Sequence, residues 1–172
     1  AAADVKKAIN VLHEDFFETT YKQLNVFIAG AGNVGGKLLS QLHQQMQYLK
    51  EHMRLQIQVV GIANSKKSIL DDAGIDLINW KYLLDQAPAS IIEKNLRNSV
   101  FVDVTANDTV ASVYGSLLSK SIAVVACNKI ACSASYANYK KLKSLARTFN
   151  TQFLFETNVG AGLPVIGTLN DL

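Results

Sequence analysis

The 172-residue sequence predicts an α/β fold in which helices cover both faces of a doubly wound, mostly parallel sheet. Short apolar runs such as VFVDV and IAVVA alternate with segments of helical periodicity, and continuous apolar runs are typical of parallel strands buried on both faces. A glycine pattern, Gly30-Ala31-Gly32-Asn33-Val34-Gly35, directly follows the first apolar run and opens an amphipathic segment. A strand that turns through these glycines into a helix is typical of a Rossmann-type domain.

Five strands and three main helices are expected. The strands are expected over 24–29, 56–62, 99–105, 122–126 and 152–156, and the helices over 33–52, 108–118 and 136–149. The first helix is expected to bury one apolar face, made of Val34, Leu38, Leu42, Met46, Leu49 and Met53. Asp108 is the expected N-cap of the second helix and Pro164 the expected first residue of a last one. Between 64 and 98 we expect two short helical segments, and the sequence does not place a strand there.

Composition limits the class of protein. With 49% hydrophobic and 18% charged residues, the chain can form one globular domain with a sizeable core. It has no apolar run of the roughly 20 residues that a membrane span needs and no signal-peptide pattern at its start, so a cytoplasmic location without membrane contact is expected. The net charge of +3 is scattered, which argues against nucleic-acid binding. Cys127 and Cys132 have neither a C-x-x-C nor a zinc-ligand spacing and are expected to be reduced, structural thiols.

The glycine pattern predicts a dinucleotide site. Gly30 would permit a tight turn, Gly32 would let the backbone approach a pyrophosphate, and Gly35 would allow close packing of helix on strand. The free N–H groups at the helix start, which includes Asn33 and Val34, would hold the phosphates. A glycine turn used for packing alone is the alternative.

The end of the second strand bears on the choice of cofactor. NAD-selective domains place an acidic residue there for the ribose 2′-OH, whereas this chain has Asn64, Ser65 and Lys66. A cation and hydrogen-bonding groups can accommodate a 2′-phosphate, so NADP is expected, with NAD possible. The alternative is an ordinary polar surface turn.

Two further segments follow strands at the edge where open α/β sheets bind ligands. Thr105 and Ala106 follow VFVDV and are expected to contact the cofactor, while Asp103 before them is expected to anchor a loop through hydrogen bonds. Asn128 and Lys129 follow IAVVA and are expected to face the cofactor and substrate. A surface lysine is the alternative for Lys129.

Glu156 and the glycine-rich segment after it form a candidate cation site. One carboxylate with several main-chain oxygens suits a hard cation rather than a thiophilic metal. The alternative is a joining loop in which Glu156 caps backbone N–H groups.

Six segments in order resemble homoserine dehydrogenase: NVFIAGAGNVGGKLL, VVGIANSKK, GIDLINW, VFVDVTAND, VVACNKIA and FETNVGAGLPVIGTLNDL. The resemblance is greatest to the bifunctional aspartokinase/homoserine dehydrogenases, in which a segment like AINVLHEDFF joins the two halves. It implies a linker or entry helix over 1–23 and an NAD(P)-binding domain over 24–172. It also implies that the region for substrate binding and dimerisation lies beyond residue 172 and that the aspartokinase half is absent.

The resemblance further implies an activity and residue roles. The whole enzyme would interconvert L-homoserine and L-aspartate 4-semialdehyde in threonine and methionine biosynthesis, as a homo-oligomer, and this chain alone would bind cofactor weakly without turnover. Thr105 would lie at the nicotinamide ribose, and Lys129 would relay the substrate hydroxyl proton. Many relatives have N-K-K-A where this chain has Ile130 after Lys129.

The family also places a sodium-like ion in the matching loop. Its ligands would be the Glu156 carboxylate and the main-chain oxygens of Val159, Ala161 and Leu163. Two other classes stay open at this point. One is the cofactor domain of another amino-acid-pathway dehydrogenase, and the other is a non-catalytic module that senses NAD(P).

Overall fold

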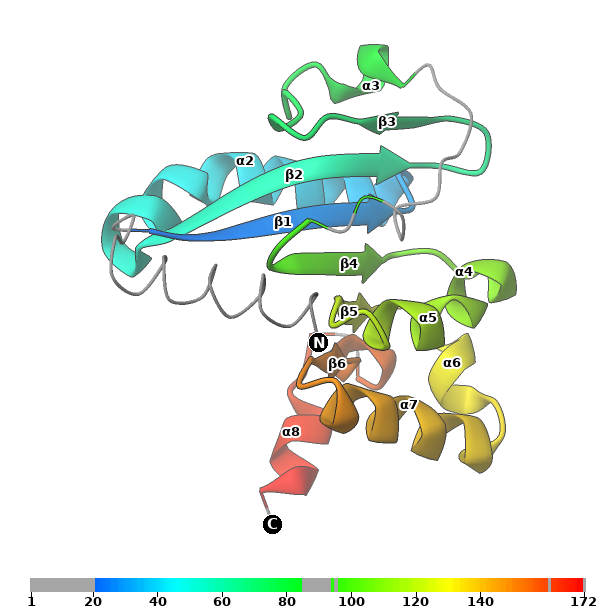
Figure 1. The fold of residues 1–172 in the computed structure, drawn as a ribbon. Coiled ribbons are helices and arrows are strands. Elements are labelled where there is room, and N and C mark those ends of the chain that lie inside the picture. The colour runs from blue at the N-terminus through cyan, green and yellow to red at the C-terminus, as the bar shows by residue number, and fades with distance from the viewer. Residues whose placement is uncertain (1–20, 85–93, 95, 161, 172) are drawn as a thin grey trace, which may run out of the picture.

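A computed structural model describes residues 21–84, 94, 96–160 and 162–171 (Figure 1). Within them, one sheet has the strand order β3-β2-β1-β4-β5-β6, which is the 3-2-1-4-5-6 order of dinucleotide-binding domains. The strands are β1 (Lys22–Ala29), β2 (Leu55–Ala63), β3 (Ser68–Leu70), β4 (Ser99–Asp103), β5 (Ala123–Ala126) and β6 (Phe153–Leu154). All neighbours pair in parallel except β2 and β3, which confirms the predicted fold class.

The structure corrects the predicted strands in three places. β1 begins at Lys22, inside the expected linker 1–23, whose residues 1–20 lie outside the described residues. β3 is an antiparallel edge strand that sequence reasoning missed, because three residues are too few to show a period. β6 has two residues instead of the expected five, since the chain passes into a 3-10 helix at Glu156.

The predicted helices are found at the expected places in the chain, but their number and their bounds differ. They are α2 (Asn33–Met53), α3 (Trp80–Leu83), α4 (Asp108–Ser112), α5 (Tyr114–Leu118), α6 (Ile130–Ser133), α7 (Tyr136–Thr148), η2 (Glu156–Asn158) and α8 (Val165–Asn170). The single helix expected over 108–118 is divided at Val113 into α4 and α5. Of the two short helical segments expected before residue 98, α3 is one, and most of the other lies outside the described residues.

Two helix starts differ from prediction. Asn107, not Asp108, is the N-cap of α4, because the Asn107 side-chain oxygen accepts hydrogen bonds from the backbone N–H groups of Thr109 (2.8 Å) and Val110 (3.3 Å). Pro164 is the N-cap of α8, which begins at Val165, one residue later than expected.

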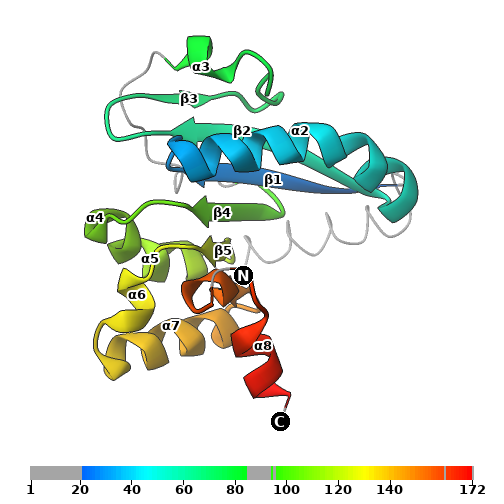
Figure 2. The same ribbon diagram turned by 180° about the vertical axis from the view of Figure 1, so that it is seen from behind.

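Helices cover both faces of the sheet, and each face has its own core. α2 passes in front of β1 and β2 in Figure 2 and behind them in Figure 1. Side chains along β1 alternate accordingly: Val26 and Ile28 join the core that contains Leu39 of α2, whereas Phe27 and Ala29 join the core built with α5 and α7. The sheet is therefore buried on both sides, as its continuous apolar strands predict.

A bulge in β2 changes which side chains face each core. Val26 pairs with Val59 but Phe27 pairs with Gly61, so Val60 is an extra residue in the parallel ladder. A Cβ on Gly61 would lie 2.6 Å from Cδ1 of Phe27, which means that the phenyl ring occupies the space a side chain would need. Gly61 within the apolar run of β2 is the sequence signal that could have indicated this bulge, since an isolated glycine in a strand often marks one.

The predicted apolar face of α2 is partly wrong. Val34 and Met53 are 59% and 61% exposed, whereas Leu39, which the prediction omitted, has no exposed surface. Val34 and Met53 belong to the first and last turns of α2, and neither is a member of the core packed beneath this helix. No helix in the described part of the chain combines the length and apolarity needed to cross a membrane.

Candidate functional site

The glycine turn joins β1 to α2 at the carboxyl edge of the sheet, where the arrowheads of β1, β2 and β4 lie together (Figure 1). Gly30 has φ +104°, a conformation that favours glycine, and its N–H donates to the carbonyl of Ala63 (2.8 Å). A Cβ on Gly35 would overlap the carbonyl oxygen of Gly30, so α2 touches the turn directly. A Cβ on Gly32 would meet no atom within 4 Å. The three glycines thus have the three environments that a dinucleotide turn requires.

A cavity of about 570 Å³ opens over this turn. Its lining combines the ends of β1, β2 and β4 with the start of α4: Ala29, Gly30, Ala31, Gly32, Ala63, Asn64, Ser65, Lys66, Thr105, Asn107 and Val110. Six of the predicted cofactor residues are among them, namely Gly30, Gly32, Asn64, Ser65, Lys66 and Thr105. The topology has therefore brought three separate segments of the sequence to one concave surface.

Asn107 and Val110 line this cavity without having been predicted. Both follow Thr105 at the start of α4, and Asn107 was assigned to neither a cap nor a ligand. The sequence does show that Thr105-Ala106-Asn107-Asp108 follows a buried strand. This position places the segment at the carboxyl edge of the sheet, but it does not tell which of its side chains line the cavity.

The other six predicted cofactor residues lie outside the lining of this cavity, in the part of the chain that is described: Asn33, Val34, Gly35, Ala106, Asn128 and Lys129. Gly35 is buried beneath the turn, while Asn33 and Val34 begin α2 with exposed side chains. Asn128 is 1% exposed, so its side chain has a role inside the protein.

The segment from Asn64 to Lys67 is the turn between β2 and β3. The Asn64 side-chain oxygen accepts the backbone N–H groups of Lys66 (2.8 Å) and Lys67 (2.7 Å), and the Asn64 N–H donates to the Lys67 carbonyl (2.8 Å). This oxygen therefore builds the turn, as asparagine commonly does. The side chains of Ser65 and Lys66 are exposed on the turn.

Asp103 is the centre of a buried hydrogen-bond network beside the cavity. The carboxylate has no exposed surface and accepts hydrogen bonds from the Thr105 N–H (2.8 Å), the Tyr114 hydroxyl (2.6 Å) and the Asn128 side-chain amide (3.0 Å). Three donors satisfy a group that would be costly to bury alone. The predicted anchoring role of Asp103 is confirmed.

Lys129 follows β5 at the same edge as the glycine turn. Its side chain is exposed, and its main chain is the N-cap of α6, where its carbonyl accepts the Ser133 N–H (2.9 Å). The backbone N–H of Cys127 donates to the Asp103 carbonyl (2.8 Å), so the chain before Lys129 is tied to β4. Lys129 thus extends into solvent from a fixed backbone.

Glu156 receives hydrogen bonds at both carboxylate oxygens. Oε1 accepts from the N–H groups of Ile166 (2.8 Å) and Gly167 (3.2 Å), and Oε2 accepts from Gly167 (2.9 Å). Glu156 therefore caps free backbone N–H groups at the start of α8. This is the capping role that the sequence offers as the alternative to a cation site. Ala161 of the predicted cation site lies outside the described residues. The described residues hold no group of three or more His, Cys, Asp or Glu side chains placed to bind a metal ion.

Asn158 joins two of these segments and was not predicted. In the amide orientation that satisfies both of its polar atoms, its nitrogen donates to the carbonyls of Ala126 (3.0 Å) and Cys127 (3.2 Å). The glycine-rich segment after β6 is thereby held against the end of β5, close to Lys129.

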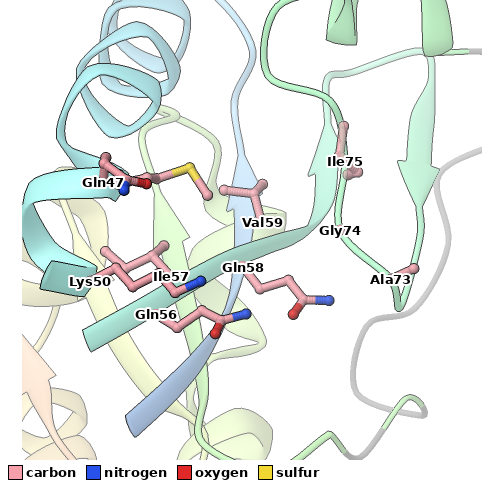
Figure 3. Close-up of a pocket in the computed structure, with 10 residues that line it drawn as sticks. Gln47, Lys50, Gln56, Ile57, Gln58, Val59, Ala73, Gly74 and Ile75 are labelled. Atoms are coloured by element: carbon pink, nitrogen blue, oxygen red, sulfur yellow. The ribbon is translucent and has the colours of Figure 1, made fainter. Parts of the chain in front are cut away.

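A second cavity of about 360 Å³ lies at the opposite end of β2 (Figure 3). Its walls come from the last part of α2, the first part of β2 and the loop at Ala73–Ile75. Gln58, one of its polar residues, already donates to the Asp72 carbonyl (2.7 Å) and accepts from Gln23 (2.8 Å). None of the predicted site residues lines this cavity, nor either of two further cavities beside α7, of about 410 Å³ and 300 Å³. The cavity at the glycine turn, which six of them line, is therefore the candidate site.

The strand order, the glycine turn and the cavity above it define a Rossmann-type dinucleotide-binding domain. The profile of the family "Homoserine dehydrogenase, NAD binding domain" matches residues 30–156. The chain belongs to the homoserine dehydrogenase family as its NAD-binding domain, and the predicted resemblance is confirmed.

Named relatives agree with this assignment. The chain is 41% identical to "Bifunctional aspartokinase/homoserine dehydrogenase 2, chloroplastic" of Zea mays, over 98% of the chain and 19% of that protein. It is 37% identical to the bifunctional enzyme of Haemophilus influenzae, over 96% of the chain and 21% of that protein. The chain therefore spans about a fifth of the length of these relatives.

Solved structures show the same fold. A hyperthermophilic archaeal homoserine dehydrogenase mutant in complex with NADPH matches with a TM-score of 0.70 and 26% identity, over 86% of this chain and 48% of that one. A Candida auris protein described as being of unknown function matches with a TM-score of 0.72 and 29% identity, over 88% and 43% of the two chains.

Proposed function

We propose that this chain binds NADP(H) in the cavity over the glycine turn and serves, within a longer protein, the interconversion of L-homoserine and L-aspartate 4-semialdehyde. The observation that carries the proposal is the convergence of the open Gly32 backbone, Lys66 and Thr105 on one cavity of about 570 Å³. A cavity of that size at the carboxyl edge suits a dinucleotide. Family membership supplies the reaction class.

A preference for NADP over NAD is supported by the turn between β2 and β3. Its four residues, Asn64 to Lys67, include two lysines and no acid, so no carboxylate is there to accept from a ribose 2′-OH or to repel a 2′-phosphate. The Asn64 oxygen is committed to the turn, which leaves Ser65 and Lys66 as the groups for a phosphate. The NADPH complex of the archaeal relative is consistent with this preference.

When bound, the nicotinamide supplies the hydride chemistry. In the proposed site Thr105 forms the wall beside the nicotinamide ribose, and Lys129 holds and moves the substrate hydroxyl proton through its ammonium group. The exposure of Lys129 is compatible with a lysine that meets substrate brought by another part of a longer protein. Such a protein would be a homo-oligomer in which the substrate-binding residues other than Lys129 come from outside residues 24–172.

The proposal includes a sodium-like cation at Glu156. Its ligands would be that carboxylate and the main-chain oxygens of Val159, Ala161 and Leu163. The Leu163 carbonyl accepts the Val165 N–H (2.9 Å), and Glu156 caps α8. A carboxylate has about four lone-pair sites and a carbonyl has two, so an ion can share these oxygens with the N–H groups.

Calorimetric titration of the chain with NADPH and with NADH tests the cofactor proposal. Saturable binding, tighter for NADPH, is expected, together with its loss in Gly32→Asp, whose carboxylate would enter open space and repel the pyrophosphate. Circular dichroism must show that this variant keeps its helices. Failure of the folded wild-type chain to bind either cofactor at millimolar concentration would contradict the proposal.

A further inference from the structure

We propose that Tyr114 is a positioning residue of the cofactor site: through Asp103 it fixes the Thr105 wall of the cavity and the Asn128-Lys129 segment relative to one another. The inference rests on the proposed function for what these segments bind. Its structural part concerns contacts among α5, the end of β4 and the segments that follow β4 and β5.

The Asp103 carboxylate connects three elements. Tyr114, which has no exposed surface, donates its hydroxyl from α5 to Oδ2 (2.6 Å), and the Asn128 amide donates to the same oxygen (3.0 Å). Oδ1 accepts the Thr105 N–H (2.8 Å). The orientation of one carboxylate therefore sets the backbone at Thr105 and the side chain of Asn128 together.

Asn128 carries this constraint to both sides of the site. Its amide nitrogen also donates to the Asn107 carbonyl (2.9 Å), and its side-chain oxygen accepts the Ile130 N–H (3.1 Å). Asn107 lines the cofactor cavity, and Ile130 follows Lys129 in the chain. A rotation of Asn128 would consequently move the cavity wall and the Lys129 backbone at once.

Tyr114 is the member of the network that can be altered without loss of packing. Its ring makes edge contacts with Phe101 (6.4 Å between centroids) and Phe153 (5.9 Å), which a phenylalanine would preserve. Burial, and then the bond to Asp103, raise the pKa of the Tyr114 hydroxyl, so that it stays a protonated donor across the usual pH range. Tyr114→Phe would leave Asp103 fully buried with one donor fewer.

The test measures NADPH affinity and amide hydrogen exchange in Tyr114→Phe, with Phe153→Leu as the matched control. Phe153→Leu removes a ring neighbour of Tyr114 but none of the network's donors. In Tyr114→Phe we expect the affinity for NADPH to fall by at least about fivefold. We also expect the exchange rates of the Thr105 and Ile130 amides to increase by a factor at least about ten times larger than the factor by which the β1 amides increase. The control should lower the melting temperature without this selective change.

Three outcomes would overturn the positioning role: exchange at Thr105 and Ile130 that changes no more than at β1, equal selectivity in Phe153→Leu, or unchanged NADPH affinity. If Tyr114→Phe does not fold, Asn128→Ala serves instead, because Asn128 is the other side-chain donor to Oδ2 of Asp103. This variant must then show faster exchange at the Thr105 amide than at β1 amides. A wild-type chain that binds no NADPH would contradict the proposed function, whereas the exchange data would still decide whether Tyr114 couples the two segments.

Discussion

Gly35 of α2 lies so close to the carbonyl oxygen of Gly30 that a Cβ on Gly35 would overlap it. The first turn of α2 can therefore pack this closely on the glycine turn only if residue 35 has no side chain. We predict that Gly35→Ala destabilises the domain by about 3 kcal/mol, the upper part of the range for overpacked sites, as measured by urea denaturation.

Gly32→Ala is the matched control for that experiment. Its Cβ would enter open space, so the loss of stability should stay within about 1 kcal/mol, the effect of a poorer N-cap. NADPH binding should nevertheless weaken, because the added methyl group faces the proposed pyrophosphate. Equal stability losses in the two variants would show that this reading of the turn is wrong.

Lys66 and Lys67 offer a matched pair for cofactor choice. Both are exposed on the turn between β2 and β3, and Lys66 lines the cavity. Lys66→Ala should weaken NADPH binding by about tenfold at low salt and leave NADH binding unchanged, because only NADPH carries the 2′-phosphate. Lys67→Ala removes the same charge and should have a smaller effect. An equal effect of Lys66→Ala on both cofactors would argue against a 2′-phosphate contact.

The N-cap of α4 can be tested by two neighbouring substitutions. Asn107→Ala removes an oxygen that serves two backbone N–H groups and should cost about 1 kcal/mol of unfolding free energy. Asp108→Ala removes a first-turn acid that accepts the Thr109 N–H, a donor that Asn107 also serves, so it should cost less. A larger loss in Asp108→Ala than in Asn107→Ala would restore the cap assignment made from the sequence.

Sodium dependence separates the two roles of Glu156. If a cation binds, the wild-type chain should melt higher in sodium chloride than in choline chloride of equal ionic strength, and Glu156→Gln should lose that difference. If Glu156 acts as a cap alone, neither protein should distinguish the salts, since glutamine still offers an oxygen to Ile166 or Gly167.

Cys132 should react slowly with alkylating agents. Burial raises the pKa of this thiol, an effect only partly offset by Asn158 and Lys143, so less thiolate is present at a given pH. In Cys127→Ser, where Cys132 is the single thiol, the alkylation rate should rise with pH through a midpoint above about 8.5, the ordinary value for cysteine. A midpoint at or below that of free glutathione would contradict this.

Sequence patterns predicted the parts of the fold that depend on long, continuous signals. α2 and the central strands β1, β2, β4 and β5 are long enough or apolar enough to be recognised from the sequence. β3 and the break at Val113 were missed, because short elements are set by their tertiary neighbours rather than by local pattern.

The site was predicted at the level of segments rather than side chains. Position after a strand correctly identified the edge that gathers Gly32, Lys66 and Thr105 into one cavity. It did not show that the Asn128 side chain turns inward to Asp103, because that contact joins residues 25 apart in sequence.

The ring of Phe27 and the missing side chain of Gly61 share one volume across the bulge between β1 and β2. The two positions should therefore vary together among homologous sequences: a larger residue at position 61 requires a smaller one at position 27, since a packed interior tolerates exchanges that conserve volume. This pairing gives an alignment-based signature of the bulge that is independent of the glycine turn and of any ligand.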